Sequence, residues 1–69
     1  MAYRILICPT DPQYLPFDPF QHGGTYTSQA LAKTHALLQA QELRPYMTAK
    51  VIRDGTTTVV AAYVGTVDS

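Results

Sequence analysis

Only one cysteine, Cys8, and no tryptophan occur among the 69 residues of the chain. One thiol cannot form an intramolecular disulfide, and no Cys/His cluster has the spacing of a structural zinc site. A domain this short buries only about 60% of the surface that its unfolded chain exposes, so its stability is marginal. Self-association or a tightly bound partner is therefore an expected source of additional stability.

Charge is scarce as well, because five basic and five acidic residues cancel and are scattered along the sequence. Binding to nucleic acid normally needs a basic patch that displaces counterions from phosphates. No such patch is present, and neither is an acidic surface that could imitate nucleic acid. The sequence therefore predicts no direct nucleic-acid binding.

Long apolar runs are missing too. The N-terminal run Ile5–Cys8 is too short for the core of a signal peptide and far too short to cross a membrane. A lone thiol fits a reducing compartment. We expect a soluble cytoplasmic protein with no membrane contact.

No known catalytic motif is recognisable. Cys8 with His22 or His35 could form a thiolate–imidazole pair, but no third orienting group accompanies them. Asp11, Asp18 and His22 have no recognised metal-ligand spacing. We therefore predict that the protein is not an enzyme and that it has no metal site and no cofactor.

Three segments carry secondary-structure signals. Residues 2–8 read as a strand, residues 27–44 as a helix capped by Thr27 or Ser28 and ended by Pro45, and residues 46–64 as a hairpin around Asp54-Gly55. The predicted fold is a single α+β domain over residues 1–69 with the order β-α-β-β. Its three strands form a mainly antiparallel sheet in the order 2-3-1, with the helix packed on one face. A long loop rich in proline and aromatic residues, 9–26, joins the first strand to the helix.

Two stripes run along the predicted helix. The wider stripe, which we expect to cover the sheet, contains Ala30, Leu31, Thr34, Leu37 and Leu38. A stripe of smaller residues contains Ala32, Ala36, Ala40 and Leu43. Surface alanine usually reflects helix propensity, and the alternative is a contact at close approach.

The hairpin register determines which side chains share a face. A two-residue turn at Asp54-Gly55 is preferred, and a bulge at Gly55 would swap the faces of the last strand. With Met47, Ala49 and Val51 on the helix, the opposite face shows apolar and amphipathic residues: Tyr46, Thr48, Lys50, Ile52, Val59, Ala61 and Tyr63, with Arg4, Leu6 and Cys8 from the first strand. This surplus of apolar area predicts an interaction surface, unless the long loop folds back over it.

The aromatic residues of the loop suit a protein interface, because aromatics are favoured anchors there. Asp18, between Phe17 and Phe20, could pair with a basic group of a partner. The candidate partner-binding residues are thus taken from the loop and the uncovered sheet face: Tyr14, Phe17, Asp18, Phe20, Tyr46, Lys50, Ile52 and Tyr63.

The β-α-β-β order, with "TSQALAK" opening the helix and "RDG" turning the hairpin, resembles small phage-encoded inhibitors of the anti-CRISPR type. The resemblance implies a non-enzymatic protein, located in the host cytoplasm if it is encoded by a phage, that blocks a host defence complex by steric binding. Its partner would be a subunit of a CRISPR effector. The same element order looks like that of dodecins, which implies a small-ligand-binding homo-oligomer as the alternative. This chain lacks the tryptophan that would stack on a flavin. A homodimer through the uncovered sheet face is a further prediction, independent of either resemblance.

Overall fold

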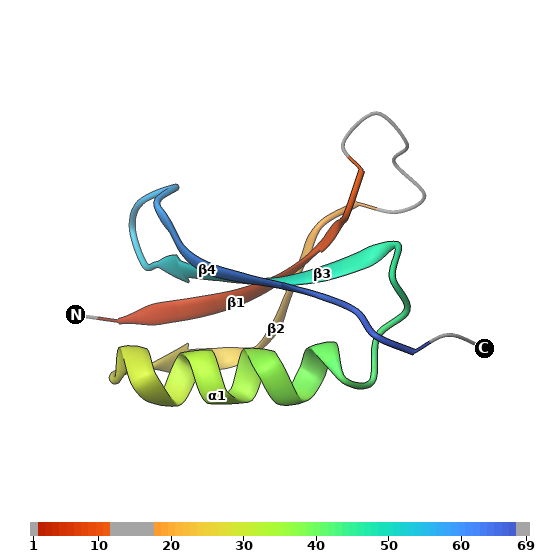
Figure 1. The fold of residues 1–69 in the computed structure, drawn as a ribbon. Coiled ribbons are helices and arrows are strands. Elements are labelled where there is room, and N and C mark those ends of the chain that lie inside the picture. Colours follow the sequence, from red (N-terminus) through yellow and green to blue (C-terminus); the bar gives the residue numbers. More distant parts are fainter. Residues whose placement is uncertain (1, 12–17, 68–69) are drawn as a thin grey trace.

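Four antiparallel strands form one sheet, and a single helix lies along one of its faces (Figure 1). The computed structural model describes residues 2–11 and 18–67. In chain order the elements are β1 (Tyr3–Pro9), β2 (Phe20–Tyr26), α1 (Gln29–Ala40), β3 (Met47–Arg53) and β4 (Val59–Val64). The α+β class and the single helix are as the sequence predicts.

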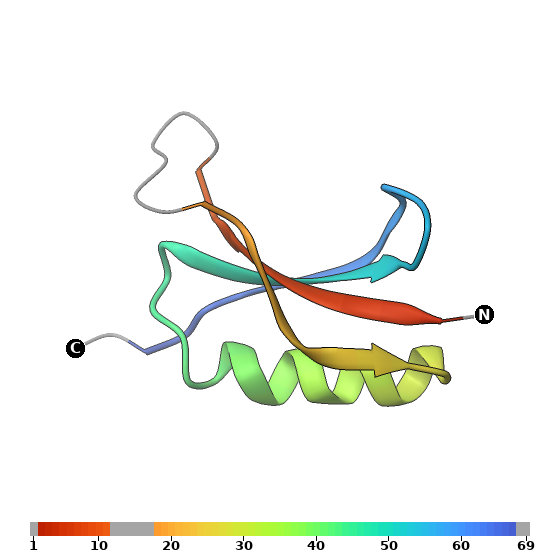
Figure 2. The same cartoon turned by 180° about the vertical axis from the view of Figure 1, so that it is seen from behind.

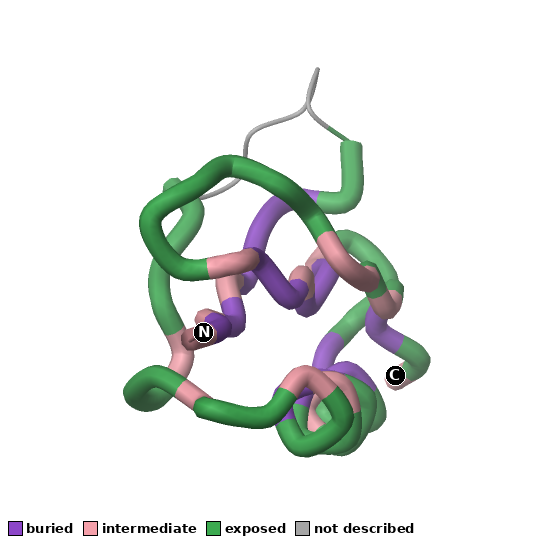
Figure 3. Tube along the Cα trace, turned by 90° about the vertical axis from the view of Figure 1, so that its left-hand side faces the viewer, coloured by how far each residue is buried: buried purple, intermediate pink, exposed green. Residues whose placement is uncertain are grey.

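The strand order is β2-β1-β3-β4, so β1 and β3 occupy the centre of the sheet. Most residues of the two central strands are buried, whereas β2 and β4 contain only exposed and half-buried residues, and the end-on view of Figure 3 shows the buried residues near the centre. The predicted order 2-3-1 is wrong, because it placed the last strand of the hairpin at the centre. Apolar side chains on both faces of β1 and β3 make these two strands the best pair for the interior of the sheet.

Strand β2 is a second correction, since the prediction had three strands and a loop through residues 9–26. Figure 2 shows β2 along the edge of the sheet next to β1. Its sequence, FQHGGTY, lacks a strand signal because two glycines interrupt it. The pairing with β1 is also irregular, with a shift in register between Arg4 and Leu6. Contact with a buried neighbour, rather than local propensity, stabilises this strand.

The helix packs on the sheet through its small residues, which reverses the predicted orientation. Ala32, Ala36 and Ala40 are buried against the sheet, while the leucines predicted to be buried face outward. The facing side chains of the sheet include Ile5, Ile7 and Val51, which are fully buried. Because large side chains of the sheet fill most of the space between the two layers, the small alanines of α1 let the helix backbone approach the sheet closely.

Both ends of α1 are capped, and the helix is shorter than predicted. The Ser28 hydroxyl accepts a hydrogen bond from the Leu31 N–H at 3.3 Å, which confirms Ser28 as the N-cap. The helix ends at Ala40, before Pro45 is reached. There the carbonyl of Ala40 accepts from the Thr66 N–H at 3.2 Å, so the segment after β4 satisfies a helix-end acceptor.

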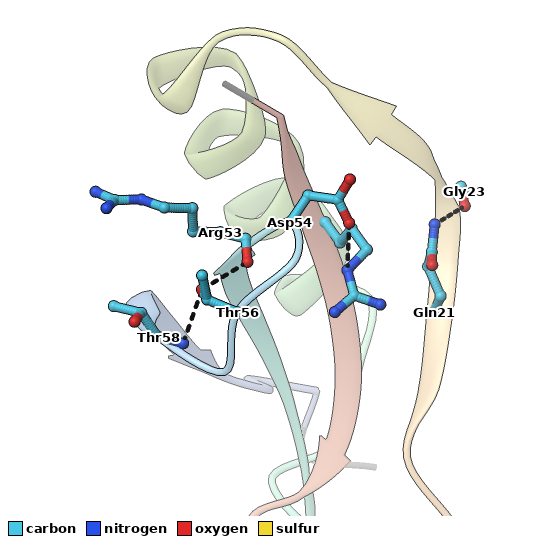
Figure 4. Close-up of polar contacts among 7 residues, drawn as sticks. Gln21, Gly23, Arg53, Asp54, Thr56 and Thr58 are labelled. Atoms are coloured by element: carbon cyan, nitrogen blue, oxygen red, sulfur yellow. Dashed lines mark hydrogen bonds and ion pairs between the residues drawn. The ribbon is translucent and has the colours of Figure 1, made fainter.

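The β3–β4 connection differs from the predicted two-residue turn. Gly55 has φ 81° and no other residue of the connection has positive φ, which excludes a turn with two positive-φ residues. Thr56 closes the turn by donating its N–H to the Arg53 carbonyl at 3.1 Å, and its hydroxyl donates to the same oxygen at 2.8 Å (Figure 4). The longer connection therefore changes the register of the hairpin.

In the observed register, Ala49 lies opposite Tyr63 and Val51 lies opposite Ala61. Ala61 and Tyr63 consequently lie on the helix-covered face and pack against the core. The prediction that they belong to the uncovered face is wrong, since an odd shift in register reverses every side chain of a strand. The predicted placement of Met47, Ala49 and Val51 on the helix side is confirmed.

Gly65, directly after β4, is buried where two backbone segments cross. Its N–H donates to the Met47 carbonyl at 2.8 Å. A Cβ atom at this position would lie 2.1 Å from the Arg44 carbonyl oxygen and 2.5 Å from that of Leu43. Only glycine permits this approach, which ties the C-terminal segment to the end of α1.

We expect Gly65→Ala to lower the free energy of unfolding by more than about 2 kcal/mol, because the added methyl group meets rigid backbone. The matched control is Gly24→Ala, since a Cβ at Gly24 meets nothing within 4 Å. That control should leave the free energy of unfolding within about 1 kcal/mol of wild type. Urea titrations of wild type and the two variants measure both effects. An unchanged midpoint for Gly65→Ala would contradict the close approach of Gly65 to the backbone of Leu43 and Arg44.

A second substitution tests the orientation of α1. Ala36→Leu should destabilise the fold by about 1–3 kcal/mol or more, because Ala36 is fully buried against the sheet. Ala30→Leu makes the same change on the exposed side of the same helix and should be nearly neutral. Equal effects of the two substitutions in thermal or urea unfolding would exclude the alanine-packed orientation.

Candidate functional site

The outer side of α1 carries the largest exposed aliphatic side chains of the described residues. Leu31 is 47% exposed, Leu37 46% and Leu38 54%. Ala30 and Thr34 lie between them and are also exposed. We refer to these five residues, Ala30, Leu31, Thr34, Leu37 and Leu38, as the leucine face.

Little polarity interrupts the leucine face. The Thr34 hydroxyl donates to the Ala30 carbonyl at 3.0 Å, so the hydroxyl is satisfied within the helix. Lys33 is the one charged residue within α1, and it is half-buried at the side of the helix. Solvent-facing helices of soluble proteins usually place charged and polar residues on this side. The leucine face is therefore an apolar surface in contact with water.

The three leucines do not all point the same way. With about 100° between successive residues, Leu31 and Leu38 lie nearly opposite the buried alanines. Leu37 lies on a flank of the helix. His35 is on the other flank, where it stacks on Tyr26 of β2 with ring centroids 5.1 Å apart. The flank that carries Leu37 therefore faces toward β4.

The face of the sheet opposite α1, which we call the open face, is less apolar than predicted. Arg4 and Lys50 lie on it, and the Arg4 Nε atom forms an ion pair with Asp54 Oδ1 at 3.2 Å. Ile52, next to Arg4 across the sheet, is only 7% exposed. The apolar groups that do reach solvent here include Val59 and Val64, so the open face is amphipathic.

The candidate residues from the loop fall partly outside the described residues. Tyr14 and Phe17 lie outside them. Asp18 is exposed, and Phe20 begins β2 opposite Ile7 and is about half exposed. Phe20 thus lies at the same end of the sheet as Tyr46.

Tyr46 is 53% exposed in the turn that leads into β3. Three hydrogen bonds that involve Thr10 link the end of β1 to this turn and to the start of β3. The Thr10 N–H donates to the Tyr46 carbonyl at 2.9 Å, its hydroxyl donates to the Pro45 carbonyl at 2.7 Å, and the hydroxyl of Thr48 lies 2.7 Å from that of Thr10. The backbone at Tyr46 is therefore well fixed, although its side chain is in solvent.

The remaining candidates are separated by the sheet. Lys50 is half-buried on the open face, opposite Leu6 on one side and Ala62 on the other. Ile52 shares that face but is buried, so a partner could touch little of it. Tyr63 lies on the helix side and packs against the core. The structure thus does not gather the six described candidates, Asp18, Phe20, Tyr46, Lys50, Ile52 and Tyr63, into one surface.

Groups with catalytic or ligand-binding potential are dispersed as well. Cys8 is buried on β1 opposite Thr48, whereas His35 is exposed on α1. Residues 2–11 and 18–67 form no detectable pocket and no cluster of three or more potential metal ligands. Within the same ranges, no helix is long and apolar enough to cross a membrane.

Comparison with known proteins adds no family. Neither protein-family models, nor curated proteins, nor solved structures gave a match to this chain. The resemblance to anti-CRISPR inhibitors and the one to dodecins stay predictions.

Sequence reasoning missed the leucine face, although a signal for it was present. Alanines recur every four residues at 32, 36 and 40, and Leu43 continues the stripe. All four are buried in the structure. A stripe of small residues beside a sheet rich in isoleucine and valine indicates close packing, which places the larger residues outside.

Truncating a leucine of this face should cost little stability. Leu38→Ala should lower the free energy of unfolding by less than about 1 kcal/mol, because the side chain is already half exposed. The control is Ile7→Ala on β1, which removes a fully buried side chain and should cost about 2–5 kcal/mol. A Leu38→Ala loss as large as that of Ile7→Ala in urea unfolding would show that the leucine face is buried.

Proposed function

We propose that this chain is a non-enzymatic protein-interaction module and that its leucine face is the docking surface. One observation carries the proposal: α1 packs on the sheet through alanines and turns three leucines toward solvent. An exposed apolar stripe of this kind on a soluble domain typically marks an interaction site.

The energetics favour a protein partner. Complete burial of a leucine contributes about 1.5–3 kcal/mol, so covering the exposed half of each side chain would contribute about 1 kcal/mol. Leu31, Leu37 and Leu38 together would then contribute roughly 3 kcal/mol before costs of association. This gain requires an apolar groove or helix on the partner that matches an amphipathic helix.

The affinity for the partner should depend little on charge. The chain has no net charge, and Lys33 is the one charged group within α1. Binding through the leucine face should therefore respond weakly to salt, unlike an electrostatically steered contact.

The specific form of the proposal is a phage inhibitor that occludes a subunit of a CRISPR effector complex. It rests on the resemblance in size and in the strand, helix and hairpin segments of the sequence, while the additional strand β2 departs from the β-α-β-β order of that resemblance. Asp18, Phe20 and Tyr46 are predicted to contribute as well. They lie at the end of the sheet away from the Tyr3–Tyr26 pair, so they would form the edge of a large interface. A dodecin-like ligand-binding homo-oligomer stays the alternative prediction.

The test compares two tagged variants with wild type in affinity captures from bacterial lysate, read by quantitative mass spectrometry. Leu31→Gln with Leu38→Gln keeps helix propensity and size but removes the apolar surface. A partner retained by wild type should be lost with this double variant. With that partner purified, calorimetry should show a loss of about 2 kcal/mol or more, about 30-fold in Kd.

The matched control is Val64→Thr, which makes a half-exposed apolar side chain of β4 polar with little change in shape. It should leave the Kd unchanged. Undiminished binding of the leucine double variant would exclude the leucine face as the docking surface. Capture of a partner other than a CRISPR effector subunit, with binding lost in the leucine double variant, would support the leucine face as the docking surface. It would exclude the proposal that the protein inhibits a CRISPR effector.

A further inference from the structure

We propose that β4 is a self-association edge, through which two copies of this chain pair antiparallel and form one continuous eight-stranded sheet. This goes beyond the proposed docking of a partner on the leucine face, because it uses a different element and a different kind of contact.

The backbone of β4 offers hydrogen-bonding groups on its outer side. The N–H of Gly65 donates to Met47 of β3, and the ladder continues with Ala49 opposite Tyr63. In an antiparallel pair, alternate residues direct both backbone groups toward the neighbouring strand. Ala62 and Val64 therefore direct their N–H and C=O groups away from β3. No strand within residues 2–11 and 18–67 lies on that side of β4.

The two edges of the sheet differ in a way that favours β4. Edge strands usually carry charge, proline or a bulge that discourages further pairing. β2 has such a device, since Gly23 at φ 72° lies within an irregular pairing with β1. β4 (VVAAYV) contains no charged residue and no proline, and its register shift lies at its beginning, before Ala61. In Figure 1 β4 crosses in front of the other strands, along the edge nearest the viewer.

A second copy fits this edge better than an unrelated strand. Antiparallel pairing of a strand with itself is two-fold symmetric, so each copy's Ala62 and Val64 would exchange hydrogen bonds with Val64 and Ala62 of the other copy. The strand is uncharged and the chain has no net charge, so two copies do not repel each other. Because β2 at the far edge is irregular, association would stop at two copies.

The helices would lie on the same side of the joined sheet. α1 lies under β3 and β4, and strands pair about 4.8 Å apart, so the two helices would be roughly 10–14 Å apart. Leu37 lies on the flank that faces β4 and would point toward the second copy. Lys33 shares this flank, so we expect the strand pairing to contribute more than the helix contact.

The experiment is sedimentation of the full chain from about 10 µM to about 1 mM, the range for an interface below standard size. Ala62→Pro removes one outward N–H and leaves the ladder with β3 intact, since proline is tolerated where a strand's N–H faces solvent. Wild type should be a monomer–dimer mixture. Ala62→Pro should raise the dissociation constant of the dimer at least about tenfold, because the two-fold symmetry removes one hydrogen bond from each copy.

Two controls separate the edge from other surfaces. Leu6→Lys alters the open face without touching β4, and Leu31→Gln with Leu38→Gln alters the leucine face. Both should keep the wild-type dimer. Loss of the dimer in Leu6→Lys but not in Ala62→Pro would assign it to the open face and overturn the proposal. If the wild type forms no dimer but still binds its partner, the β4 proposal fails and the proposed function stands.

A measurement on the wild type covers the case in which Ala62→Pro does not fold. Amide hydrogen exchange of Ala62 and Val64 should slow as the protein concentration rises, whereas Thr57 in the hairpin connection should be unaffected. Exchange at Ala62 and Val64 that does not vary with concentration, or a wild-type monomer at about 1 mM, would overturn the proposal.

Discussion

Close contact between the alanines of α1 and the sheet is the constraint on which the remaining features depend. Ile5, Ile7 and Val51 fill the space beneath the helix, so only small side chains fit on its inner side. Leu31 and Leu38, which lie nearly opposite the alanines around the helix, must then face solvent. An apolar outer surface thus follows from the way in which this domain builds its core.

The same packing determines how the ends of the fold are joined. A helix held close to the sheet brings its last carbonyls near the segment after β4, where Thr66 donates to Ala40 and Val67 to Leu43. Gly65 permits the crossing. Backbone hydrogen bonds therefore link the end of the helix to the segment after β4, which is one answer to the marginal size of the domain.

The α+β class and the approximate places of β1, α1 and the β3–β4 hairpin could be predicted, because strong local signals determine them. The isoleucines of β1, the Ser28 cap and the turn at Gly55 each specify their element. The order of the strands, the pairing of β2 and the inner side of α1 depend on contacts between distant residues. For α1, two stripes compete, and only the bulk of the sheet decides between them. The face of Tyr63 was mispredicted for the same reason, since it depends on the hairpin register.

The most direct test is the solvent exposure of methyl groups, measured by NMR with a soluble paramagnetic agent on protein labelled at alanine and leucine methyls, at a concentration low enough to keep it monomeric. The methyls of Leu31 and Leu38 should relax strongly, while those of Ala32, Ala36 and Ala40 should be protected. Protected leucines with exposed alanines would contradict the alanine-packed helix, and with it the leucine face as a docking surface.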